Sequence, residues 1–329
     1  MRIFELTRRL MEIESITGNE AAVGYFLRDY LSGLKYDVSL QEAAPNRFNV
    51  IAFAGKPELV FSTHIDTVPP YLPVSEDEEY LYGRGACDAK GIVAAQIEAA
   101  ENLRASGAGR VGLLFVVGEE RDSVGALAAN KIPPGSRFLI DGEPTDNHLA
   151  LGSKGSLRVE ISARGKAAHS AYPQMGESAI LKLLDLLEEI RAMPLPHDPI
   201  LGESTCNIGV LEGGTKANII PDSARAELMF RSVEPIKLLK ERLEILIAGR
   251  ADRRYLFDVP PFIMQAMEGF ETTIVSFASD APFLTQWGKP FLLGPGSILN
   301  AHTDHERISK PELLEGVELY VRLARTLLS

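Results

Sequence analysis

Apolar runs that end in a carboxylate or an imidazole constrain the fold of this chain more than any other feature. Three such runs are predicted to be short buried strands, at residues 57–62, 111–117 and 137–140. His64 and Asp66 follow the first run, Glu119 the second and Glu143 the third. Residues two apart in an extended chain point to the same side, so His64 can face a site while Asp66 supports it.

Helical patterns alternate with these strands. Apolar side chains recur at helical spacing in four segments, at residues 2–13, 20–32, 92–106 and 311–328. The alternation predicts an α/β fold with a mostly parallel sheet and helices on both faces. Ligands of such sheets bind at the carboxyl ends of the strands, where the charged residues stand.

A different order of elements begins near Gly155. Six segments follow one another as β-α-β-β-α-β, at residues 157–163, 178–191, 205–211, 224–231, 235–248 and 254–259. This order is typical of a small separate domain. We therefore expect an inserted domain at residues 155–262 and a discontinuous metal-binding catalytic domain made of residues 1–154 and 263–329.

Composition excludes several kinds of partner. The net charge of −11, spread along the chain, argues against binding to nucleic acid or to an anionic membrane. Cys87 and Cys206 match neither a disulfide framework nor a Cys-x-x-Cys motif, which favours a reducing compartment. No run reaches the roughly 20 apolar residues of a membrane span, and residues 1–10 do not resemble a signal peptide. A cytoplasmic protein is expected.

Metal-type ligands follow the predicted strands in several separate segments. Carboxylates next to buried strands need compensation of their charge, and two divalent ions would supply it. Two ions about 3.5–4 Å apart need a bridging carboxylate, with one imidazole and one further carboxylate for each ion. One complete set is present, drawn from His64, Asp88, the pair Glu119 and Glu120, Glu143 and His302.

The spacing of these motifs resembles the co-catalytic zinc amidohydrolases and exopeptidases. That family includes acetylornithine deacetylase, succinyl-diaminopimelate desuccinylase, glutamate carboxypeptidase and the aminoacylases. The resemblance covers essentially the whole chain, and its nearest branch is that of the acetylornithine and acetyl-lysine deacetylases. It rests on five ordered motifs: residues 62–68 (STHIDTV), 83–91 (GRGACDAKG), 118–120 (GEE), 142–145 (GEPT) and 294–296 (GPG) ahead of Ala301 and His302.

The resemblance implies a role for each catalytic position. Asp88 would bridge both ions. His64 and Glu143 would complete one metal site, and Glu120 and His302 would complete the other. Glu119 would be the general base that takes a proton from the metal-bridging water, and Asp66 would orient His64. Zinc is the expected metal, and cobalt or manganese would accept the same ligands.

The inserted domain would act as a lid and as a dimerisation domain. The resemblance implies that His169 hydrogen-bonds the developing oxyanion, acting from the partner subunit or in its own chain. Asn218 and Arg231 match positions that hold the free carboxylate of the substrate, which a guanidinium binds with two parallel hydrogen bonds. We therefore expect a homodimer.

Two of the metal-ligand assignments have an alternative residue nearby in the sequence. Asp141 competes with Glu143 as a ligand, and His305 competes with His302 because both could belong to a His-x-x-His pair. The family that the motifs resemble has a Glu four residues after its ligand His, and Glu306 matches that position, so the resemblance implies His302 as the ligand. Three further residues are expected to lie outside the site: His148 and His197 in solvent, and Cys87 as a small packed side chain.

The predicted activity is hydrolysis of the amide bond of an N-acyl amino acid, similar to the deacetylation of N-acetylornithine or N-acetyl-lysine. Desuccinylase, dipeptidase and carboxypeptidase activities on a short peptide are close rivals. A non-catalytic metal-binding homologue would be expected to lack Glu119 or a ligand, and none is missing. A dinuclear phosphoesterase is disfavoured because the chain has no Gly-rich phosphate loop.

Overall fold

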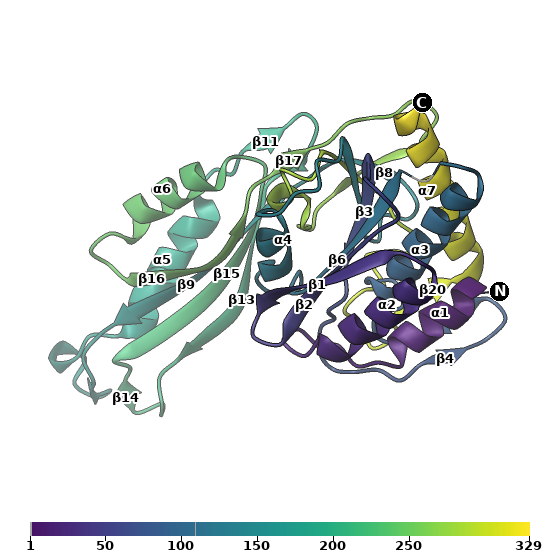
Figure 1. The fold of residues 1–329 in the computed structure, drawn as a ribbon. Coiled ribbons are helices and arrows are strands. Elements are labelled where there is room, and N and C mark those ends of the chain that lie inside the picture. The colour runs from purple at the N-terminus through teal and green to yellow at the C-terminus, as the bar shows by residue number, and fades with distance from the viewer. Residues whose placement is uncertain (1, 109) are drawn as a thin grey trace. The chain divides into compact units, whose positions relative to one another are not determined.

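The computed structural model describes residues 2–108 and 110–329. The chain forms two compact units (Figure 1). The first unit consists of Met1–Leu151, Met264–Thr273 and Ser279–Ser329, and the second of Gly152–Ile263 and Ile274–Ala278. The second unit is therefore an insertion in the chain of the first.

A six-stranded sheet forms the centre of the first unit. Its order is β1 (Asp37–Ala44), β2 (Arg47–Phe53), β6 (Val111–Val116), β3 (Leu59–His64), β7 (Phe138–Asp141) and β19 (Lys289–Leu292). Strands β6, β3, β7 and β19 pair in parallel, and the antiparallel hairpin β1–β2 joins them at the β6 edge. The expectation of a mostly parallel sheet is confirmed.

Helices cover both faces of this sheet (Figure 1). One face packs against four helices, α1 (Arg2–Met11), α2 (Ala21–Gly33), α3 (Lys90–Ala105) and α7 (Lys310–Leu328). The other face packs against α4 (Val124–Ala129) and the segment that starts with η2 (Ala281–Phe283). Neighbouring residues of β3 point to opposite faces of the sheet. Phe61 is buried in the core that contains α1, α2, α3 and α7, and Val60 is buried in the core that contains α4. Both side chains are fully buried, so β3 is buried on both faces and does not alternate between buried and exposed residues.

The second unit contains the predicted β-α-β-β-α-β series. Its elements are β9 (Gly155–Arg164), α5 (Ala179–Ala192), β13 (Thr205–Gly213), β15 (Ser223–Ser232), α6 (Ile236–Ile247) and β16 (Asp252–Val259). The strands form an antiparallel sheet in the order β13-β15-β9-β16. Alternate residues of β9, such as Val159 and Ile161, are buried in one core with α5 and α6.

The opposite face of this second sheet is polar. Arg158 pairs with Glu227 at 2.6 Å, and Glu160 pairs with both Arg225 and Arg254 at 3.2 Å. Glu160 and Glu227 stand directly opposite each other on β9 and β15. The arginines therefore offset a repulsion that would otherwise destabilise this strand pair.

Short elements complete the chain. Two three-stranded sheets consist of β4 (Ser75–Glu76), β5 (Tyr80–Tyr82) and β20 (Arg307–Ser309), and of β8 (Leu149–Ser153), β17 (Phe262–Ile263) and β18 (Thr272–Val275). The remainder are β10 (Ala168–His169) with β14 (Ile219–Ile220), β11 (His197–Asp198) with β12 (Gly202–Glu203), and η1 (Pro173–Met175). Within the described ranges, no helix has both the length and the apolar character needed to cross a membrane.

Candidate metal centre

The carboxyl ends of the parallel strands bring the candidate residues together. His64 is the last residue of β3, and the loops after β6, β7 and β19 carry Glu119 with Glu120, Glu143 and His302 respectively. Asp88 lies just before the first residue of α3. Because β6, β3, β7 and β19 run in parallel, these loops leave the sheet at one edge.

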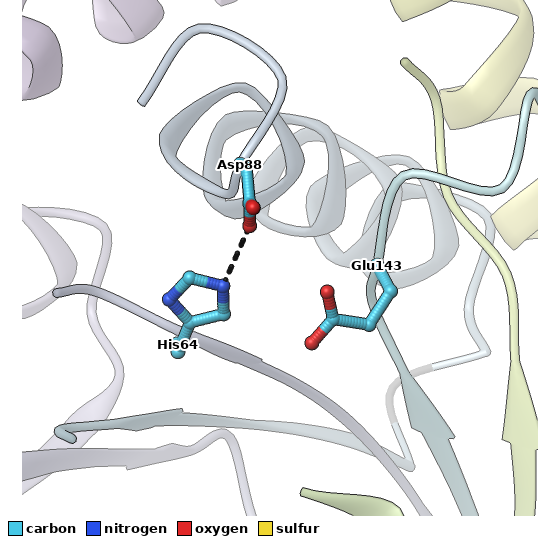
Figure 2. Close-up of side chains that lie close together, drawn as sticks. All are labelled: His64, Asp88 and Glu143. Atoms are coloured by element: carbon cyan, nitrogen blue, oxygen red, sulfur yellow. Dashed lines mark hydrogen bonds and ion pairs between the residues drawn. The ribbon is translucent and has the colours of Figure 1, made fainter. Parts of the chain in front are cut away.

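One cluster of possible ligands is fully buried. It consists of His64, Asp88 and Glu143, whose ligand atoms lie within 4.8 Å of one another. Figure 2 shows the imidazole of His64 pointing at Asp88 and the Glu143 carboxylate facing the same space. The His64 Nε2 atom is 2.9 Å from Asp88 Oδ1. Imidazole and carboxylate donors in this arrangement fit a divalent ion such as zinc.

A second cluster shares Asp88 with the first. His302 Nε2 lies 3.3 Å from Asp88 Oδ2 and 3.0 Å from Glu120 Oε2. The ligand atoms of these three residues again lie within 4.8 Å of one another. Asp88 thus presents one oxygen to each imidazole, which is the arrangement that a carboxylate bridging two ions requires.

The charge balance of the clusters also fits two cations. Burial, and next the charge of Glu119, raise the pKa of Glu143 well above its usual value. Hydrogen bonds with Asp88 and Glu120 raise the pKa of His302 to about 10. Buried carboxylates outnumber the imidazoles here, so the site has a deficit of positive charge that two divalent ions would supply.

Asp66 holds the loop that follows β6. Its carboxylate accepts hydrogen bonds from four groups: the backbone N–H of Gly118 (2.9 Å), Glu119 (3.2 Å) and Glu120 (3.3 Å), and the hydroxyl of Thr17 (2.8 Å). Towards His64, the backbone oxygen of Asp66 lies 2.9 Å from Nδ1, whereas its carboxylate lies 3.6 Å away. Asp66 therefore contacts His64 chiefly through its main chain. Sequence reasoning missed the contacts of the carboxylate with the loop.

A buried ion pair lies beneath the same loop. Arg47 donates to Glu20 at 2.6 Å, and both side chains are nearly inaccessible to solvent. Gly118 has φ +87°, and a Cβ atom there would lie 2.7 Å from Arg47 Nη2 and from Asp122 Oδ1. Only glycine fits this turn without moving the ion pair.

Glu119 differs from its neighbours because its carboxylate has no hydrogen-bond partner in the part of the chain that the structure describes. Burial raises the pKa of Glu119 well above its usual value, against the effect of His64, and the carboxylates of Asp280 and Glu120 raise it further. An unpaired carboxyl group with a raised pKa, next to a ligand cluster, is suited to accept and return a proton.

The competing candidates lie outside both clusters. Neither cluster contains Asp141 or His305, and His305 is exposed. His148 forms an ion pair with Glu271 and His197 one with Glu203. Cys87 is fully buried, and its Sγ lies 3.7 Å from Glu306.

Asp280 is a buried carboxyl group that the sequence analysis did not identify. Neither of its carboxylate oxygens has a hydrogen-bond partner among residues 2–108 and 110–329, and the residue is 2% exposed. Burial raises the pKa of Asp280 to about 7. Burial and then the charge of Asp280 raise the pKa of Asp141 to about 8. No spacing motif marks Asp280, because the charged groups around it, such as His64 and Asp66, are distant in sequence.

The predicted lid residues all lie in the second unit. His169 pairs with Ile219 in the short β10–β14 ladder, and the next N–H, that of Ser170, donates to the backbone oxygen of Asn218 at 3.0 Å. His169 and Asn218 are therefore neighbours. Arg231 lies near the end of β15, where its Nη1 donates to Ser156 Oγ at 3.3 Å.

Removing metal ions should make the stability of the protein increase with acidity. A carboxyl group whose pKa is higher in the folded than in the unfolded chain takes up a proton on folding, so lowering the pH stabilises the fold between the two values. The folded values are about 8 for Asp141 and about 7 for Asp280, against 3.8 for a free aspartate. The carboxyl groups of Asp66 and Asp88 have lowered pKa values, so their titration affects the stability of the fold only at lower pH.

We therefore expect the Tm of the metal-free protein to rise as the pH is lowered from about 7 to about 5. The Tm of the zinc-loaded protein should rise less, because His64 interacts electrostatically with both Asp141 and Asp280, and an ion held by His64 would favour the ionised form of these two carboxyl groups. Calorimetry at several pH values tests this, and Asp280→Asn in the metal-free protein should flatten the trend. A metal-free Tm that falls over this range would contradict the prediction.

Comparison with known proteins identifies the family. The model of peptidase family M20/M25/M40 matches residues 60–326. A peptidase M20 domain-containing protein of Schizosaccharomyces pombe is 40% identical over 334 residues, covering 98% of this chain and 84% of that protein. A probable carboxypeptidase of Uncinocarpus reesii is 35% identical over 384 residues, covering 98% of this chain and 86% of that protein.

Solved structures show the same fold. The crystal structure of a tripeptidase from Staphylococcus aureus superposes with a TM-score of 0.81 at 22% identity, covering 98% of both chains. The family match spans most of the chain, and the relatives are similar over nearly all of it. The chain belongs to peptidase family M20/M25/M40 and is a metal-dependent hydrolase.

Proposed function

We propose that the protein hydrolyses the amide bond of an N-acyl amino acid or short peptide that carries a free carboxylate. Metallopeptidase-type hydrolysis follows from the family, and the substrate class is our proposal. The observation that carries it is the pair of ligand clusters that share Asp88, with the carboxylate of Glu119, which has no hydrogen-bond partner in the described part of the chain, beside them.

The ligands divide between two divalent ions. His64, Asp88 and Glu143 would hold one ion, and Asp88, Glu120 and His302 the other. Bound ions would polarise the scissile carbonyl and would lower the pKa of the attacking water. Zinc suits this set of oxygen and nitrogen donors best, with cobalt and manganese as substitutes.

Glu119 would carry the proton during the reaction. Its carboxylate accepts a proton from the attacking water and returns it to the nitrogen of the leaving amine. The adjacent Glu120 is hydrogen-bonded to His302, whereas Glu119 has no such partner among the described residues. Asp66 supports both residues by binding the three backbone N–H groups of their loop.

His169 is suited to donate a hydrogen bond to the developing oxyanion. Its Nδ1 accepts a hydrogen bond from the backbone N–H of Ala171 at 3.1 Å. The ring proton of the neutral imidazole therefore resides on Nε2, which makes Nε2 a donor. The residue is exposed, so this donor is accessible to a substrate.

The lid residues favour a homodimer in which two chains build each site. The β10–β14 ladder lies beyond the end of the sheet where Arg164 pairs with Ser223. Arg231 is eight residues further along β15, a rise of roughly 27 Å. That separation exceeds the length of an N-acyl amino acid. One substrate could then contact His169 and Asn218 of one chain together with Arg231 of the other chain, which supports the homodimer that we propose.

Two branches of this activity remain as candidate functions. Residues 155–262 would form the lid and dimerisation domain in either case, with Arg231 gripping the substrate carboxylate. The motif pattern favours deacetylation of an N-acetylornithine-like or N-acetyl-lysine-like substrate. The naming of relatives such as that of Uncinocarpus reesii as probable carboxypeptidases supports removal of a C-terminal amino acid from a short peptide.

Glu119→Gln should separate metal binding from catalysis. The amide cannot take the proton from water, so kcat should fall by about 10²- to 10⁴-fold. Elemental analysis should still find two ions per chain, because Glu119 belongs to neither cluster. Glu271→Gln, at an exposed ion pair, is the matched control and should retain full activity. A fully active Glu119→Gln protein would contradict the assignment.

A substrate panel should show dependence on the free carboxylate. We expect hydrolysis of N-acetyl, N-succinyl or dipeptide substrates to drop by roughly a hundredfold in kcat/KM when their carboxylate is amidated, because the lid groups then lack their partner. Fastest turnover of N-acetylornithine would establish the deacetylase branch, and fastest turnover of N-blocked dipeptides the carboxypeptidase branch. Equal hydrolysis of amidated substrates would argue against the carboxylate anchor.

Mixed dimers should show whether His169 acts across the dimer. Glu119→Gln and His169→Ala each remove one component, so each homodimer should be nearly inactive. Random mixing of the two chains would give heterodimers with one intact site, restoring about a quarter of wild-type activity. If His169 acted within its own chain, the mixture would remain inactive.

A further inference from the structure

A second buried ion pair lies beside the shared carboxylate and has no part in the mechanism described above. Glu306 is 1% exposed and Arg84 is 2% exposed. Arg84 Nη1 donates to Glu306 Oε2 at 2.6 Å. Both residues belong to the first unit, where Arg84 precedes Asp88 and Glu306 follows His302 in sequence.

The other oxygen of Glu306 holds the main chain at Asp88. Glu306 Oε1 accepts hydrogen bonds from the backbone N–H of Cys87 and of Asp88, each at 3.3 Å. The backbone oxygen of Glu306 accepts a further hydrogen bond from the N–H of Gly83 at 2.9 Å. Glu306 therefore fixes both ends of the segment that leads to the shared carboxylate.

The same contacts reach the loop that carries His302. Glu306 stands four residues after His302, and Arg84 Nη1 also lies 3.4 Å from the backbone oxygen of Thr303. The side chain of His302 is half exposed, in contrast to that of His64. Its position relative to Asp88 therefore depends on how the two loops are joined.

We infer that Glu306 is a positioning residue for the shared metal carboxylate, an assignment that rests on the proposed function. It aligns the main chain of Asp88 with the His302 loop, so that each oxygen of Asp88 faces one imidazole. Glu306 is not itself a ligand, since Arg84 and two backbone N–H groups occupy its oxygens. Partners that orient metal ligands in this way commonly strengthen metal binding.

Substitutions can distinguish a pair that only stabilises the fold from a Glu306 that positions Asp88. Removing one charge alone would leave the other buried and unpaired, which destabilises any protein. The informative variants therefore replace both residues. Arg84→Met with Glu306→Gln removes the charges but keeps a side-chain oxygen for the two backbone N–H groups. Arg84→Met with Glu306→Leu removes the charges and that oxygen.

Metal affinity should distinguish these two double variants. Metal-free proteins would be titrated with Zn²⁺ against a competing chelator, with Co²⁺ absorption as a spectroscopic record of the ligand geometry. The Gln variant should bind both ions as the wild type does. The Leu variant should lose about 10- to 100-fold in affinity for at least one ion, with an altered Co²⁺ spectrum. Circular dichroism of the metal-free proteins checks that each is folded.

Equal affinities of the Leu variant and the Gln variant would overturn the inference. If the Leu variant does not fold, Arg84→Met with Glu306→Ala takes its place: a loss of about tenfold in affinity relative to the Gln variant supports the role of the oxygen, and equal affinities overturn it. Fewer than two ions per wild-type chain would instead contradict the proposed metal centre. Two ions in the wild type with no difference between the variants would contradict only the role of Glu306.

Discussion

Mutual repulsion among buried carboxylates is the constraint on which this structure depends. The carboxyl edge of the parallel strands gathers Asp88, Glu119, Glu120 and Glu143, and among residues 2–108 and 110–329 the imidazoles of His64 and His302 reach the same space. Such a cluster is costly without cations, because water is excluded and the charges are close. The loops that carry these side chains are held by hydrogen bonds to their backbone groups.

Each loop is fixed by a polar group that is not a candidate ligand. Asp66 binds three consecutive N–H groups after β6, and Glu306 binds two before α3. Thr145 has the same function after β7, since its hydroxyl accepts from the N–H of Gly294 at 3.0 Å and so joins the Glu143 loop to the turn after β19. Catalytic geometry here therefore depends on hydrogen bonds between segments that are far apart in sequence.

Local sequence patterns predicted the helices and strands well, but they did not predict the contacts between segments that are distant in sequence. The helical spacing of Ile3, Leu6 and Leu10 indicated α1, and the apolar run after Arg110 indicated β6, because periodicity and burial are local properties. The order of the second unit was predicted for the same reason. Spacing drew attention to Glu306, but the contacts of Glu306, the contacts of Asp66 with the loop and the buried carboxyl group of Asp280 could not be predicted from it. Their surroundings are created by segments that meet only after folding.

The insertion of the second unit has a consequence for the order of assembly during synthesis. Strand β19, helix α7 and the loop with His302 all come from residues after the insertion, yet they complete the first unit. A nascent chain that ends before them would leave one edge of β7 unpaired, and Phe61 without its edge-on contact to Tyr320. The second unit has its own core and can form while the ribosome continues. The metal centre is therefore completed last, and a truncated or stalled chain would carry an incomplete ligand set.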